Sequence, residues 1–174
     1  RPVVAALWVL AALFALLQVG RLSAFMADPE RTWGSLVPDP AVTDHACLSA
    51  YVVAADLSRR GTANLYDERY YPAFAGDAAK LIAPADVQHL ARWMEDPFEY
   101  PPPFLLFPRA ALLLTDDFLA IRAGWFVLQA LGLVVVAAWL ARWIGGRDGR
   151  LALLLVPVLL ASLPTMLGLQ FGQF

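Results

Sequence analysis

Asp44 and His45 are the side chains whose types and position best suit chemistry. They lie at the start of an expected helix, in a polar segment that follows a long apolar run. A carboxylate held beside a membrane can take a proton from a hydroxyl group presented at the membrane surface. In the alternative interpretation, Asp44 or Thr43 only caps the free amides of the following turn. His45 could pair with Asp44 or bind a phosphate, or it could be an ordinary surface histidine.

Arginine and glutamine side chains within apolar segments are the next candidates. Arg109 interrupts an apolar run, and an arginine at membrane depth is costly unless it faces a partner or a cavity. It could equally extend its charged end to the interface. Gln173, near the end of another apolar run, either lines a polar pocket or marks the membrane boundary. Arg59, Arg60 and Arg92 could also meet a lipid phosphate.

The sequence predicts no metal site and no cofactor. His89 has no partner at ligand spacing. Asp116 and Asp117 are better explained as a helix-initiating turn before Phe118 than as a metal-binding pair. Cys47 is the only cysteine, which excludes an internal disulfide and a cysteine metal site. The net charge of −2 carries no nucleic-acid signal.

The composition indicates which elements must position these residues. Hydrophobic residues make up 60% of the chain and charged residues 16%, against roughly half and about a quarter in soluble proteins. Residues 2–20, 123–141 and 151–174 contain no Asp, Glu, Lys or Arg. Each run is close to the ~20 residues that cross a hydrocarbon core of ~30 Å. The sequence therefore predicts an all-α, polytopic transmembrane protein.

Residues 100–115 form a fourth apolar candidate. They begin with Tyr100 and three prolines, which cannot lie in the middle of a helix but can begin one. A tyrosine at this point suits the headgroup region of a membrane. At ~1.5 Å per residue the segment reaches only ~24 Å, so to cross it must be extended, tilted or partly buried. We predict a span here.

The first apolar run is predicted to be an uncleaved membrane anchor. No small-x-small cleavage site lies near Gly20, and residues 21–26 continue largely apolar after it, unlike the end of a signal peptide. The first transmembrane helix is therefore expected within residues 1–27.

Residues 28–100 hold most of the charge. Apolar residues at three- and four-residue spacing over 47–57 predict an amphipathic helix that ends at Gly61, with polar residues such as Asp56 turned away from the stripe. A second helix of the same kind is expected over residues 84–95. Both are predicted to rest on the membrane surface.

An ordered set of motifs runs along the chain. It comprises Asp44 after the first span, Tyr51-x-x-Ala54-Ala55, Gly61, Leu65-Tyr66-Asp67, Tyr100-Pro101-Pro102-Pro103-Phe104-Leu105-Leu106 and Pro164…Gly172-Gln173. This set resembles glycosyltransferase family 87 of the GT-C superfamily, whose multi-pass membrane enzymes take a sugar from a polyprenyl-phosphate carrier. The resemblance covers nearly all of the chain, which would be the N-terminal part of such a protein.

The resemblance implies an inverting hexosyltransferase, with mannose a candidate sugar. It would transfer the sugar from a polyprenyl-phosphate donor to a hydroxyl group of a lipid or glycan acceptor. Asp44 would act as the catalytic general base. His45, Tyr100, Arg109 and Gln173 would bind the donor or the acceptor.

The same resemblance implies a GT-C-like fold in the plasma (inner) membrane, with residues 28–100 extracytoplasmic and about three spans in residues 101–174. If all four apolar segments cross, the arginine-rich connection at 142–150 lies on the same side as the long loop. That would contradict the tendency of positive residues to stay inside. Either the tendency fails locally, or residues 100–115 do not fully cross.

A non-catalytic polytopic membrane protein or a transporter subunit remains the alternative. In that interpretation Arg109 and the final apolar run, which Pro157 and Pro164 interrupt, would line a substrate path.

Overall fold

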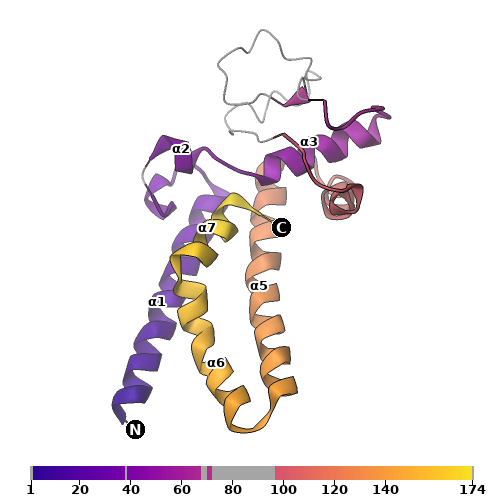
Figure 1. Ribbon diagram of the computed structural model, residues 1–174. Coiled ribbons are helices and arrows are strands. Elements are labelled where there is room, and N and C mark those ends of the chain that lie inside the picture. Colours follow the sequence, from indigo (N-terminus) through magenta and orange to yellow (C-terminus); the bar gives the residue numbers. More distant parts are fainter. Residues whose placement is uncertain (1, 38, 68–69, 72–96, 174) are drawn as a thin grey trace. The chain divides into compact units, whose positions relative to one another are not determined.

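The computed structural model describes residues 2–37, 39–67, 70–71 and 97–173. The elements found there are α-helices and 3-10 helices, in agreement with the predicted all-α class. The chain divides into two compact units (Figure 1). Unit 1 comprises residues 1–36 and 123–170, and unit 2 comprises residues 37–122 and 171–174.

Unit 1 is a bundle of long apolar helices. It contains α1 (Pro2–Ala27), most of α5 (Phe118–Ile144), α6 (Gly146–Ala161) and α7 (Leu163–Phe171), and α5 runs opposite to α1 and α6 (Figure 1). The short helix η1 (Thr32–Gly34) folds back on α1, where a Cβ at Gly34 would lie 2.6 Å from the Arg21 carbonyl oxygen. The buried core is contributed by Leu22, Phe25, Met26, Phe126, Met166 and Leu169.

The outward faces of unit 1 are apolar as well. Helices α1 and α5 are each long and apolar enough to cross a membrane, and the pair α6 and α7, bent by 60°, counts as a third candidate span. Exposed side chains along them include Val3, Leu10, Leu16, Leu17, Leu131, Val135 and Leu155. Surfaces of this kind are stable in hydrocarbon rather than in water. These features are those of a multi-pass membrane protein.

Two breaks in unit 1 have identifiable causes. Between α5 and α6 the chain turns at Gly145 and Gly146, which have φ of +69° and +57°, a conformation that glycine adopts readily. Helix α6 ends at the extended residue Ser162. Pro164 follows in the first turn of α7, where its ring prevents a continuous helix through the preceding turn.

Unit 2 is built around α3 (Leu48–Arg59), which packs against the 3-10 helix η5 (Pro102–Leu105) and against α4 (Leu106–Ala111). The unit also contains α2 (Pro40–Thr43) and the first turn of α5. Residues 48–57 are all buried. Helix α3 is therefore the centre of this unit.

The prediction that Asp56 is turned outward from this helix is wrong, whereas the location of the helix at the membrane surface stays a prediction. Asp56 is only 8% exposed, because its carboxylate pairs with Arg59 at 3.0 Å and with Arg60 at 2.7 Å. These ion pairs offset the free-energy cost of burying the Asp56 carboxylate, which the sequence pattern predicts to face water. The predicted stop is confirmed, since Gly61 follows the helix with φ of +80°. The second expected helix, over residues 84–95, lies outside the described residues.

Residues 100–115 do not form the predicted fourth span. They contain η5, the six-residue α4 and the turn that follows it. At ~1.5 Å per residue α4 is about 9 Å long, far short of a hydrocarbon core. The three prolines limit the entrance to a 3-10 turn, and Leu105, Pro108 and Leu112 are buried within unit 2.

Candidate active site

The loop between α2 and α3 brings a histidine and a cysteine together. Thr43 closes α2 by donating its hydroxyl to the carbonyl oxygen of Asp39 at 2.9 Å. The chain then passes through Asp44 and His45 to Cys47, which is the N-cap residue of α3. His45 Nε2 lies 3.1 Å from Cys47 Sγ, so the two side chains are within hydrogen-bond distance.

The last residues of unit 2 complete this cluster. Phe171 packs edge-on against the ring of His45, with 4.9 Å between the ring centroids and 86° between the planes. Gln173 Nε2 donates to Cys47 Sγ at 3.7 Å. A weak donor contact to sulfur contributes little energy. It does, however, place Gln173 beside Cys47, although 126 positions separate the two residues in sequence.

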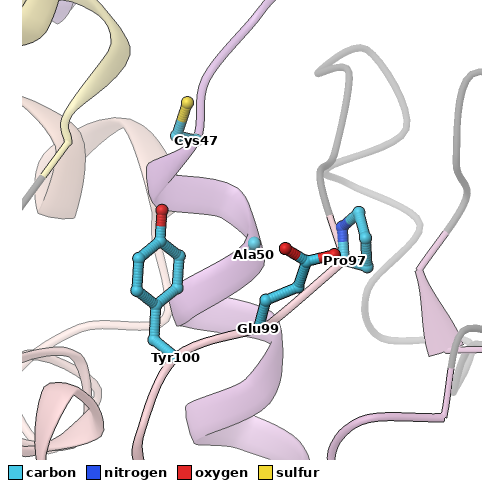
Figure 2. A pocket seen from close by; sticks show the side chains of 5 residues that line it. All are labelled: Cys47, Ala50, Pro97, Glu99 and Tyr100. Carbon is cyan, nitrogen blue, oxygen red and sulfur yellow. The ribbon is translucent and has the colours of Figure 1, made fainter.

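Cys47 also lines a pocket of about 220 Å³ together with Ala50, Pro97, Glu99 and Tyr100. In Figure 2 the Tyr100 hydroxyl points toward Cys47, and the Glu99 carboxylate lies near Ala50 and Pro97. With about 30 Å³ for each water molecule, the pocket has room for roughly seven. It is smaller than the ~300–1,000 Å³ of sites that enclose a drug-sized ligand. It can therefore hold one small polar group or part of a larger ligand.

Aromatic stacking fixes the Tyr100 side of the pocket. The ring of Tyr100 stacks on that of Tyr51 at 4.8 Å, and Tyr51 meets Phe98 edge-on at 5.9 Å. Tyr66 donates its hydroxyl to the Tyr100 carbonyl oxygen at 3.1 Å. Tyr51 and Phe98 are buried, whereas Tyr100 is 40% exposed. Tyr100 thus combines a rigid support with an accessible ring and hydroxyl.

Three of the five predicted site residues gather around Cys47. His45 and Gln173 contact its sulfur, and Tyr100 shares the pocket with it. Asp44 is half-buried and adjoins His45 in the same loop. The N-cap residue of α3 is Cys47, whose side chain makes no capping hydrogen bond, and not Asp44 or Thr43. The catalytic role of Asp44 stays a prediction.

Arg109 lies apart from this group. It is exposed on α4 and is not among the described residues that line the pocket. The predicted role of the Asp116-Asp117 pair as a helix start is confirmed, since Asp117 Oδ1 accepts a hydrogen bond from the Leu119 amide at 2.9 Å. Among the described residues, no group of three His, Cys, Asp or Glu side chains could hold a metal ion.

The sequence interpretation missed two charged residues of unit 2. Glu99 lines the pocket, and its only sequence signal was its position directly before Tyr100. Arg122 is fully buried in the first turns of α5. It was overlooked because the charge-free run was counted from residue 123. An arginine at the start of a candidate membrane span is a functional candidate by default.

Comparison with known proteins does not assign the chain to a family. No family model matches it, and neither a curated protein nor a solved structure shows significant similarity.

Proposed function

We propose that the chain forms the membrane-embedded and extracytoplasmic parts of a GT-C-type glycosyltransferase, which transfers a hexose from a polyprenyl phosphate to an acceptor hydroxyl. The observation that carries the proposal is the convergence of His45, Tyr100 and Gln173 on Cys47. Residue type and position in the sequence alone indicate these three residues as candidates. Convergence of distant polar residues at a pocket is typical of a binding site.

In the proposed mechanism Asp44 accepts the proton of the acceptor hydroxyl as that oxygen attacks the sugar carbon. The bond between the sugar carbon and the phosphate oxygen breaks, and the polyprenyl phosphate leaves with the bonding electron pair. A cation near the departing phosphate would stabilise its charge. Arg109 was selected for this role from the sequence, although it is not among the described residues that line the pocket. Tyr100 and Glu99 would hold hydroxyl groups of the sugar or of the acceptor in the pocket.

The revised count of spans supports an extracytoplasmic site. Residues 100–115 do not form a span, so among the described residues between the long polar segment and the α5–α6 turn, α5 alone is long and apolar enough to cross a membrane. Arg142 at the end of α5 and Arg147 and Arg150 in the first turns of α6 flank this turn, which would then lie on the opposite side of the membrane from the polar segment. The positive-inside tendency assigns these arginines to the cytoplasm. The conflict that four spans would create is thereby removed.

One observation favours the transporter alternative. The break between α6 and α7 resembles the discontinuous helices that form substrate sites in transporters. Yet the polar side chains at that break are already engaged. The Ser162 hydroxyl lies 2.7 Å from the carbonyl oxygen of Leu159 and 2.9 Å from the hydroxyl of Thr165. Within unit 1 the break thus serves packing, and we rank this alternative second.

The test is sugar transfer by the Asp44→Asn variant in reconstituted vesicles supplied with polyprenyl-phosphate mannose and membrane lipid acceptors. Loss of a general base typically costs about 10²–10⁴-fold in rate, and we expect a loss in that range with normal membrane insertion. The matched control is Asp39→Asn, which removes an exposed carboxylate near the same loop and should leave the rate unchanged.

Wild-type transfer by Asp44→Asn would exclude Asp44 as the base. If Glu99→Gln alone abolished transfer, the base would have to be assigned to Glu99. Solute flux by the wild-type protein without any sugar transfer would favour the transporter alternative.

A further inference from the structure

Helix α4 presents two different faces. Leu105, Pro108 and Leu112, spaced three and four residues apart, are buried within unit 2, where α4 packs against α3. On the other side, Leu106 is 72% exposed, and Leu113 and Leu114 in the turn that follows the helix are 80% and 88% exposed. An isolated exposed leucine needs no explanation, but neighbouring leucines with most of their surface uncovered form an apolar patch.

Contacts to α3 hold this face in its outward position. Arg59 Nη1 donates to the carbonyl oxygen of Leu112 at 3.1 Å, at the C-terminus of α4, where carbonyl groups lack helical partners. The same guanidinium lies 3.4 Å from Asp116 and 3.0 Å from Asp56. The leucines therefore cannot turn inward without breaking these contacts.

The short connection between α4 and α5 limits how far Leu113 and Leu114 can lie from the membrane. Helix α5 has 27 residues and at ~1.5 Å per residue is about 40 Å long, which equals the ~40–45 Å of a bilayer with its headgroups. Its first residue therefore lies at headgroup level. Leu114 precedes Phe118 by four residues, so even an extended chain keeps them within about 14 Å.

We propose that Leu106, Leu113 and Leu114 dock unit 2 on the outer surface of the bilayer, and that Arg109 binds lipid phosphate there. Arg109 shares the exposed side of α4, since it follows Leu106 by three residues and is itself exposed. A guanidinium can bind a phosphate group through two parallel hydrogen bonds. Leucines beside one cation form the pattern of an element that lies in the membrane interface. The α3–α4 pair is thereby held at headgroup level, where a lipid-linked substrate presents its phosphate.

The test measures the depth of a single fluorescent label in the full chain, reconstituted in vesicles of phosphatidylethanolamine and phosphatidylglycerol. The background is Cys47→Ser, because Cys47 is the only cysteine. Labels are placed through Leu113→Cys and Leu114→Cys. Matched controls are Ala63→Cys, exposed after α3, and Leu128→Cys, exposed on α5.

We expect quenching by shallow spin-labelled lipids to be several-fold stronger at 113 and 114 than at 63, and quenching by iodide to show the opposite order. Arg109→Glu should reduce the lipid quenching at 113, because a carboxylate repels the phosphate. Label 128 should respond only to deep quenchers, which verifies that each preparation is inserted.

Labels at 113 and 114 that behave like the label at 63 would overturn the proposal, as would labels that neither lipid nor iodide can quench, since protein would then cover the leucines. An Arg109→Glu variant with unchanged quenching would remove the phosphate contact. None of these measurements requires sugar transfer, so the result is independent of the proposed function.

Discussion

The two units of this protein differ in which of their surfaces are apolar and in how their polar groups are satisfied. Unit 1 has an apolar core and an apolar exterior, and its long helices expose leucine and valine along most of their length. Unit 2 buries a helix with polar residues and satisfies them internally, as Asp56 does with Arg59 and Arg60. The difference shows that the membrane supports unit 1, whereas unit 2 depends on its own hydrogen bonds and ion pairs.

This difference also explains where the chemistry is expected. Hydrocarbon offers no partner for a polar group, so polar residues of unit 1 are useful mainly where they bind one another. Unit 2 can maintain a histidine, a cysteine and a carboxylate beside a pocket, because its buried scaffold already contains satisfied polar groups. The predictions below test this contrast, beginning with the largest expected effect.

Gly149→Ala should lower the stability of the protein more than the substitutions of Gln170 and Asp56 considered below, because Gly149 lies where α6 closely approaches α5. A Cβ at Gly149 would collide with the backbone carbonyl oxygen of Ala141, and backbone atoms cannot move aside as a side chain can. We expect a destabilisation of about 3 kcal/mol, the upper end of typical overpacking costs. The measurement is the thermal unfolding midpoint of purified protein in detergent.

Gly132→Ala is the matched control, since a Cβ there meets nothing within 4 Å. It should leave the midpoint unchanged or raise it slightly through better helix propensity. Equal midpoints for the two variants would show that the α5–α6 hairpin is not tightly packed.

Much of unit 1 could be predicted from the sequence, and the reason is physical. A charge-free run of about 20 residues has few stable alternatives to a membrane span, so α1, α5 and the region of α6 and α7 were identified. Hydropathy alone does not show whether an apolar segment is buried in lipid or against other parts of the protein. Residues 100–115 were therefore predicted to cross, although two of their five leucines, Leu105 and Leu112, are buried inside unit 2.

Gln170→Leu should have the next largest effect. The Gln170 side chain is fully buried and bonds both the Leu36 amide and the Ser35 hydroxyl. Leucine would leave both groups without this partner, and one buried unpaired group typically costs about 1–3 kcal/mol. We expect a loss of about 2 kcal/mol in the free energy of unfolding, measured by denaturant titration in detergent.

Gln173→Leu is the variant for comparison. Gln173 is exposed, and its hydrogen bond to Cys47 Sγ is weak because sulfur is a poor acceptor. The variant should keep its stability but lose sugar transfer if the proposed function is correct. The opposite result, a stable Gln170→Leu and an unstable Gln173→Leu, would reverse the structural and functional roles of the two glutamines.

The candidate site could be predicted only in part. Position relative to the first span singled out Asp44 and His45, and the aromatic-proline boundary singled out Tyr100. Nothing in the local sequence indicates that Gln173 lies beside Cys47, because that contact joins residues 126 positions apart. Glu99 was missed for a similar reason, since its role depends on a pocket wall that α3 supplies. Spacing reveals neighbours along a helix, but not across a fold.

Asp56→Asn tests whether unit 2 depends on its own ion pairs, and we expect the smallest of the three effects. Breaking a fully buried pair costs about 3–5 kcal/mol, but here the side chains of Arg59 and Arg60 are 40% and 38% exposed. Water therefore screens much of the interaction, and we expect a loss of about 1 kcal/mol, seen as a lower unfolding midpoint. The control is Asp28→Asn, whose partner Arg31 lies at 3.0 Å in an exposed pair, and its effect should be smaller still. If both variants unfold at the wild-type midpoint, internal ion pairs do not stabilise unit 2, and apolar burial around α3 must stabilise it as it does unit 1.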